Sequence, residues 1–155
     1  MDAEIINPFL AATINVIETM AAMKVTPQKP VLKQGNKSWG VVSGIIGIAG
    51  KDIHGNLVLS FDEPSILEIV DGMLGEKHET VTPDVIDAVG EITNMISGNA
   101  KAMLSEKGYA FEMATPMMMV GQGVEITQLS KEPVISLPFK TPGGSFVAEI
   151  CMHRK

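Results

Sequence analysis

The longest helical pattern in the chain runs from residue 82 to about residue 107. Thr82 is a suitable N-cap residue, Pro83 suits the first helical position, and Gly108 follows the last turn. With about 3.6 residues per turn, one stripe of this segment is apolar and should face a core: Val85, Val89, Ile92, Ile96 and Met103. The opposite stripe is polar and should point outward: Asp87, Glu91, Asn94, Gly98 and Lys101.

Two further segments have helical spacing of their apolar residues. The first is 5–23, where Asn7-Pro8 offers a start because proline is tolerated in a first helical turn. The second begins at Glu63-Pro64 and ends at Gly75.

The remaining apolar runs predict strands. In the first half they cover 31–37, 39–49 and 56–61, with turns at 35–36 and 54–56. Glycines at 40, 44 and 47 indicate bulges in the second strand or a helix packed closely against it. After Gly108, apolar residues return at Phe111, Met113 and 117–120. Three further runs then predict a meander, at 124–129, 134–139 and 145–152, with turns at 121–123, 130–132 and 141–144.

The order of these elements is helix, three strands, helix, then helix and about three strands. Two similar halves favour a duplicated helix-plus-three-strand unit that forms one antiparallel sheet with helices on one face. The predicted fold class is therefore a two-layer α+β domain, and a single domain is expected to span 1–155.

The composition narrows the function classes. Of the 155 residues, 45% are hydrophobic and 19% charged, which predicts a folded chain, and the net charge of -6 argues against nucleic-acid binding. No basic signal-peptide start is present, and no apolar run approaches the roughly 18 residues of a membrane helix. The one cysteine, Cys151, excludes a disulfide within the chain, so we expect a reduced, cytoplasmic location without membrane contact.

Residues for metal or cofactor chemistry are scattered. His54, His78 and His153 share no ligand spacing, and neither a G-x-S-x-G elbow nor a Walker lysine motif occurs, so no metal or cofactor site is expected in this chain. Gly121-Gln122-Gly123 is typical of a hairpin turn. The run 117–119 of three methionines is open to two interpretations: an adaptable binding surface, or core filling beside a sheet edge.

Gly90 and Gly98 flank Asn94 at four residues on either side of the long helix. A glycine inside a helix costs about 1 kcal/mol relative to alanine. One interpretation is a bare backbone that lets a partner approach while Glu91 and Asn94 project into it. The other is an ordinary solvated polar face that tolerates two glycines.

The spacing Asp87-x3-Glu91-x2-Asn94, followed after 21 residues by Pro116, resembles the signature of the CheC, CheX and FliY family of bacterial chemotaxis phosphatases. The order of elements is most similar to the CheX branch. Members similar to CheC carry a second copy of the motif on the first helix. Here that helix has Asn15 and Glu18 in the opposite order, so a single site is expected, as in CheX.

The resemblance implies that the substrate is a phosphorylated CheY-type response regulator, which itself binds the Mg²⁺. It implies that Asn94 enters the regulator's active site and orients a water, and that Glu91 pairs with a regulator lysine. Gly90 and Gly98 would form the partner surface, Asp87 and Pro116 would support the site, and a homodimer would form through the sheets. The alternatives are a non-catalytic adaptor of the same fold, in chemotaxis or flagellar-switch signalling, and an oligomeric scaffold without regulator binding.

Overall fold

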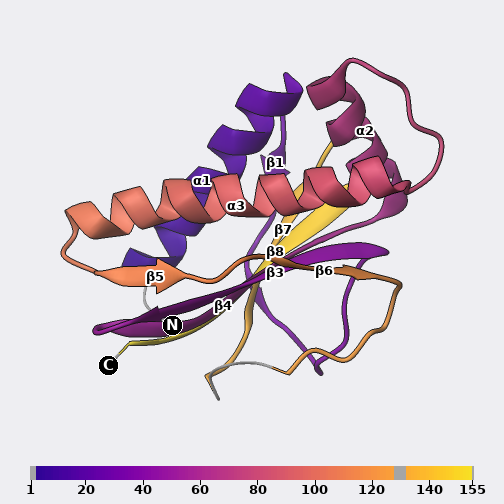
Figure 1. Ribbon diagram of the computed structural model, residues 1–155. Coiled ribbons are helices and arrows are strands. Elements are labelled where there is room, and N and C mark those ends of the chain that lie inside the picture. The colour runs from indigo at the N-terminus through magenta and orange to yellow at the C-terminus, as the bar shows by residue number, and fades with distance from the viewer. Residues whose placement is uncertain (1–2, 128–131, 155) are drawn as a thin grey trace.

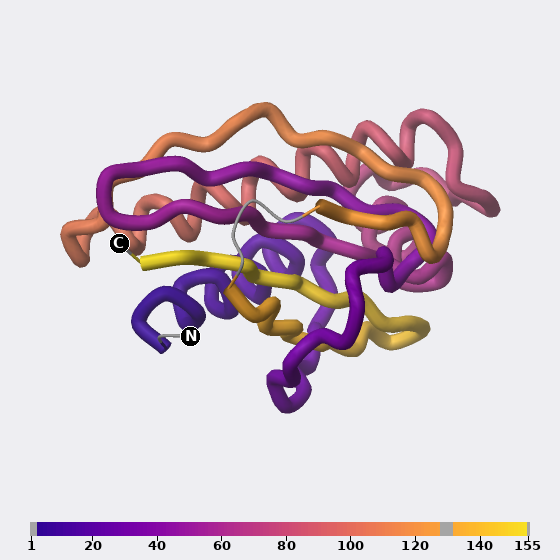
Figure 2. The backbone as a smooth tube through the Cα atoms, turned by 90° about the horizontal axis from the view of Figure 1, so that it is seen from below, coloured from indigo at the N-terminus to yellow at the C-terminus, as the bar shows by residue number. Residues whose placement is uncertain are grey.

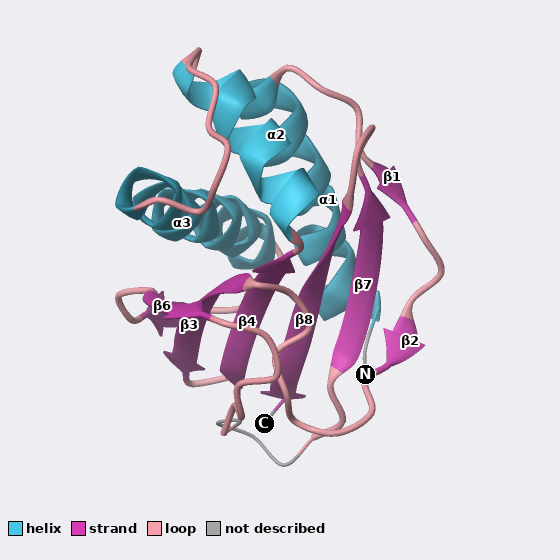
Figure 3. Ribbon diagram, turned by 90° about the vertical axis from the view of Figure 1, so that its right-hand side faces the viewer, coloured by secondary structure: helices cyan, strands magenta, loops and turns pink. Residues whose placement is uncertain are grey.

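The computed structural model describes residues 3–127 and 132–154, in which three helices cover one face of a single sheet (Figure 1). The helices are α1 (Ala3–Ala21), α2 (Glu63–Leu74) and α3 (Pro83–Glu106). The strands are β1 (Thr26–Pro27), β2 (Val31–Leu32), β3 (Val42–Gly50), β4 (Ile53–Phe61), β5 (Phe111–Met113), β6 (Met117–Val120), β7 (Ile135–Lys140) and β8 (Ser145–Arg154). All strand pairs are antiparallel, and the predicted two-layer α+β class is confirmed (Figure 3).

The strand order is symmetric about the sheet centre. It reads β1-β7-β8-β4-β3-β5, with β2 beside β7 and β6 beside β3. The long central strands β4 and β8 pair along their whole length, with Leu57 opposite Ile150. Each half contributes one hairpin, β3-β4 in the first half and β7-β8 in the second. Each half also contributes two short strands that pair with the hairpin of the other half: β1 and β2 pair with β7, and β5 and β6 pair with β3. Seen from the sheet side, the edge segments therefore enclose both hairpins (Figure 2).

The helices repeat in the same way, which identifies the two halves residue by residue. Thr13 in α1 and Thr93 in α3 are both fully buried, and each hydroxyl donates to the carbonyl four residues earlier at 2.7 Å. An offset of 80 residues also superimposes the burial patterns of the two helices from residue 5 to residue 17, with only small differences. Pro30 and Pro116 precede β2 and β6 in the same manner. Among the described residues of the second half, no helix corresponds to α2.

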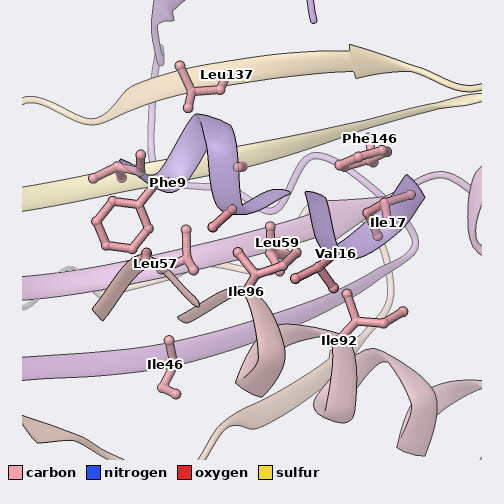
Figure 4. Close-up of a cluster of buried hydrophobic side chains, with 14 of the residues drawn as sticks. Phe9, Val16, Ile17, Ile46, Leu57, Leu59, Ile92, Ile96, Leu137 and Phe146 are labelled. Carbon is pink, nitrogen blue, oxygen red and sulfur yellow. The ribbon is translucent and has the colours of Figure 1, made fainter. Parts of the chain in front are cut away.

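The core lies between the helices and the sheet. Phe9 and Ile17 from α1 and Ile92 and Ile96 from α3 meet the inner sheet residues, all fully buried (Figure 4). Fully burying one such side chain stabilises the fold by about 1.5–3 kcal/mol. The inner stripe predicted for α3 is confirmed up to Ile96. The stripe was expected to end at Met103, but this residue is only half-buried, and the last buried residue is Leu104.

Several predicted strand limits are wrong for reasons of long-range packing. The strand predicted at 31–37 ends at Leu32, and Lys33 follows it, with its amide donating to the Val134 carbonyl at 2.9 Å and its Nζ to Glu149 at 2.8 Å. The turn predicted at 54–56 lies inside β4. Gly55 has φ 157°, and a Cβ there would collide with the carbonyl of Cys151 on the neighbouring strand. This glycine permits a close strand approach.

Other limits shift with less consequence. The strand predicted at 39–49 runs from Val42 to Gly50. The first helix begins at Ala3, so Pro8 lies inside the helix and not at its start. Of the strand predicted at 124–129, the described part forms one bridge, between Lys37 and Glu125; residues 128–129 and most of the 130–132 turn lie outside the described residues. The close helix packing expected at Gly44 is confirmed, since a Cβ there would collide with Thr93 Oγ1.

Candidate functional site

α3 holds its polar stripe outward by a well-anchored start and a buried opposite face. The Thr82 hydroxyl accepts a hydrogen bond from the Val85 amide at 3.4 Å, and Pro83 occupies the first turn. Because Val89, Ile92 and Ile96 are buried against the sheet, the opposite side of the helix, with Glu91 and Asn94, is directed to solvent. The outward phase predicted from the sequence is confirmed.

Asp87, Glu91 and Asn94 are exposed on successive turns of this face. Their side chains form no hydrogen bond or ion pair with residues 3–127 or 132–154. A carboxylate and an amide, three residues apart on a rigid helix, are thus free to bind groups of another molecule. Such a pair offers an acceptor for a cation beside a group that both donates and accepts hydrogen bonds.

The two glycines beside Asn94 have different surroundings. A Cβ added at Gly90 would lie 3.4 Å from both Sδ and Cε of Met118, whereas one added at Gly98 would meet no heavy atom within 4 Å. Met118 Cε also lies 3.4 Å from the Cβ position of Gly44. Met118 therefore fills a slot between α3 and β3. Only Gly98 leaves open space next to the polar stripe.

Pro116 lies half-buried directly before β6, which pairs with β3 beneath α3. The structure therefore brings the predicted site residues onto one helix face and the start of the adjacent strand. Sequence reasoning missed Met118, which is inserted next to Gly90. The run of three methionines at 117–119 was the sequence feature that could have revealed Met118. The alternation of side chains along a strand does not by itself tell which of the three enters a helix interface.

The charge of the stripe changes along the helix. Asp84, Asp87 and Glu91 make its first half acidic, close to the positive end of the helix dipole. Lys101, further along, pairs with Glu112 at 3.4 Å and lies 6.0 Å from the centre of the Phe111 ring. The acidic half therefore presents negative charge without a neighbouring cation on its own face, which suits a lysine of a partner.

The connection between α2 and α3 is tied down by His78. Its backbone amide donates to Asp71 Oδ1 at 2.8 Å, and its Nδ1 lies 2.9 Å from the same oxygen. The hydrogen bond to Asp71 raises the pKa of His78 above its usual value, against a smaller lowering by desolvation. This contact fixes the segment that leads into the first turn of α3.

Among the residues that the structure describes, no group of three or more His, Cys, Asp or Glu side chains could hold a metal ion. None of the helices described is both long enough and apolar enough to cross a membrane.

The profile described as "Chemotaxis phosphatase CheX" matches residues 42–140. The chain belongs to the CheX family. The matched segment contains α3 and Pro116 but not α1. The resemblance noted from the spacing of Asp87, Glu91, Asn94 and Pro116 is therefore confirmed at the level of the family.

Individual relatives agree with this assignment. The CheY-P phosphatase CheX of Thermotoga maritima is 25% identical over 127 residues, which cover 81% of each chain. A CheC-like superfamily protein from Shewanella sp. PV-4 superimposes with a TM-score of 0.91 at 46% identity, over 99% of each chain. The CheX–CheY–BeF3–Mg²⁺ complex from Borrelia burgdorferi contains a chain with a TM-score of 0.81 at 25% identity, over 96% of this chain and 97% of that one.

Proposed function

We propose that this protein is a phosphatase that removes the phosphoryl group from the aspartate of a CheY-type response regulator. Two relatives support the proposal: the Thermotoga maritima protein is named a CheY-P phosphatase, and the Borrelia burgdorferi protein is found in complex with CheY. The observation that carries the proposal for this chain is the exposed Glu91/Asn94 pair, whose side chains bind no other described residue.

Asn94 is proposed to enter the regulator's active site and hold the attacking water. Phosphoryl transfer needs mainly positioning and neutralisation of charge, and an amide can donate to one group while it accepts from a water. An asparagine has no useful basicity, so it places the water without deprotonating it. Its rigid helical backbone limits the number of positions that the amide can take.

Glu91 is proposed to pair with a lysine of the regulator, one turn from Asn94. The acidic first half of the α3 stripe supports this role because it attracts the lysine before contact. Asp87 and Pro116 are proposed to support the site, one on the same stripe and the other at the start of β6. Mg²⁺ is proposed to come from the regulator, so this chain would need no cofactor of its own.

The direct test is phosphate release from a phosphorylated CheY-type regulator with and without this protein. We expect the protein at substoichiometric amounts to shorten the lifetime of the phosphorylated form at least tenfold and to turn over repeatedly. An adaptor of the same fold would bind the regulator but leave that lifetime unchanged. Removal of Mg²⁺ from the regulator should abolish the acceleration.

We also propose a homodimer and a cytoplasmic location. β6 lies at a sheet edge, and its Met117 and Val120 are 64% and 59% exposed, so a second copy could cover this edge. Light scattering on a size-exclusion peak would decide, and a monomer at tens of micromolar would contradict the dimer. Cys151, the single cysteine of the sequence, is a buried thiol, which suits a reducing compartment.

A further inference from the structure

A groove of about 280 Å³ lies between α1 and α3, directly beside the polar stripe. On the α1 side it is lined by Asn15, Val16, Thr19 and Met20, and on the α3 side by Met95, Gly98 and Asn99. None of these residues is charged, in contrast to the acidic half of the stripe. Met20 is 40% exposed although its side chain is large and apolar.

Gly98 is responsible for the open α3 wall of this groove. No heavy atom lies within 4 Å of a Cβ built at Gly98, so packing within the chain does not require a glycine. Alanine would be favoured there by about 1 kcal/mol in an exposed helix interior. A glycine that no internal contact needs, at the rim of an uncharged groove, indicates that space is needed for something outside the chain.

The position of the groove relative to Asn94 determines what covers it. Gly98 lies one turn beyond Asn94, about 6 Å along the axis and about 40° around the helix. A standard protein interface buries about 800 Å² per partner, which corresponds to a patch roughly 30 Å across. The groove therefore lies within reach of a partner that encloses Asn94.

We propose that the α1–α3 groove receives an apolar side chain of the response regulator. This inference rests on the proposed function. It assigns two parts to the interface: the acidic half of α3 attracts the regulator's lysine, and the uncharged groove supplies apolar contact and sets the position of the partner. α1, which carries no Glu/Asn pair at the matching positions, thereby takes part in binding.

The test compares Gly98→Leu, which fills the groove, with Ala102→Leu, which adds the same side chain at an exposed α3 position outside it. The probe is a CheY-type regulator activated with beryllofluoride and Mg²⁺ for binding, and the phosphorylated regulator for turnover. We expect Gly98→Leu to raise Kd and KM at least tenfold, more than it changes kcat, and Ala102→Leu to change neither by more than twofold. Circular dichroism and thermal melting should show both variants folded.

A second variant examines the α1 wall. Met20→Ser should weaken regulator binding severalfold, a loss that docking on α3 alone does not predict. An unchanged Kd in both Gly98→Leu and Met20→Ser would overturn the proposal that the groove binds the regulator. An altered oligomeric state of Gly98→Leu in light scattering, with an unchanged Kd, would also overturn it and would place a second copy of this chain in the groove. If the wild-type protein neither binds nor dephosphorylates any of the organism's CheY-type regulators, the proposed function itself fails.

Discussion

α1 and α3 share the pattern of a buried inner face, but the residues that they direct outward have different chemistry. At the 80-residue offset, buried Phe9, Thr13 and Val16 of α1 match buried Val89, Thr93 and Ile96 of α3. The outward positions do not match: α1 has Asn7, Leu10, Ala11 and Ile14 where α3 has Asp87, Gly90, Glu91 and Asn94. The fold needs the inner face of both helices, and it is satisfied with either outer face.

This difference separates stability from function. If the outer residues of α3 served folding, α1 would need similar residues in the symmetric position, and it has none. The carboxylate, the amide and Gly98 on α3 are thus best explained by an external partner, whereas Gly90 also faces Met118 within the chain. Substitutions on this face should change activity or binding and leave the fold intact.

The largest effect is expected from Asn94→Ala. Dephosphorylation of the regulator should fall roughly a hundredfold or more, the scale for loss of a group that places a reacting water. Folding and regulator binding should stay near wild type, because no buried group loses a partner and alanine favours the helix. Phosphate release at saturating and limiting protein would show the loss. Asn7→Ala, the same substitution on the outer face of α1, is the control and should retain full activity; near wild-type turnover by Asn94→Ala would exclude the mechanism.

Glu91→Lys should have the next largest effect, on recognition. It places like charge against the regulator's lysine, so the Kd for the activated regulator should rise by about tenfold or more, with a smaller effect at high salt. Titration of the activated regulator at two salt concentrations would measure this. Ala11→Lys, at the matching position of α1, supplies a control for the added charge. Unchanged binding by Glu91→Lys would remove the proposed ion pair.

Gly90 is predicted to tolerate alanine but not leucine, although α1 carries Leu10 at the same position. A Cβ fits at the ordinary contact distance of 3.4 Å from Met118, whereas the larger side chain must displace Met118 or project towards the partner. Gly90→Ala should keep or slightly raise the melting temperature, and Gly90→Leu should lower dephosphorylation severalfold. Comparing turnover with thermal melting for both variants separates the two effects. Full activity in Gly90→Leu would show that close approach at this turn is not needed.

The smallest effect is expected from His78, which anchors the approach to α3. Since the bond to Asp71 raises the folded-state pKa of His78, its stabilisation is complete below the usual value of 6.5 and is lost as pH rises through the raised value. His78→Gln should therefore lower the melting temperature slightly at pH 6, and by less at pH 8. A difference from wild type that is equal at both pH values would show that the charged form does not contribute.

The parts of the molecule that the sequence predicted well are those with a local signal. The limits of α3 follow from Thr82, Pro83 and Gly108, and the outward phase of Glu91 and Asn94 follows from helical periodicity alone. The failures lie where distant segments meet. Gly55 has the local signature of a turn but serves the approach of β8, and Met118 shows its role only once β6 is placed beneath α3.

The crossing of the edge strands has a consequence for the origin of this asymmetry. Because β1 and β2 complete the hairpin of the second half and β5 and β6 complete that of the first, neither half could close its sheet alone, and two copies of one half would have to interlock as a pair. Such a pair, built from one gene, would carry identical outer faces on its two helices. Once a single gene encodes both halves, the sequence of each helix can change independently. α3 is then free to acquire or keep Glu91 and Asn94, while α1 diverges into a surface for docking.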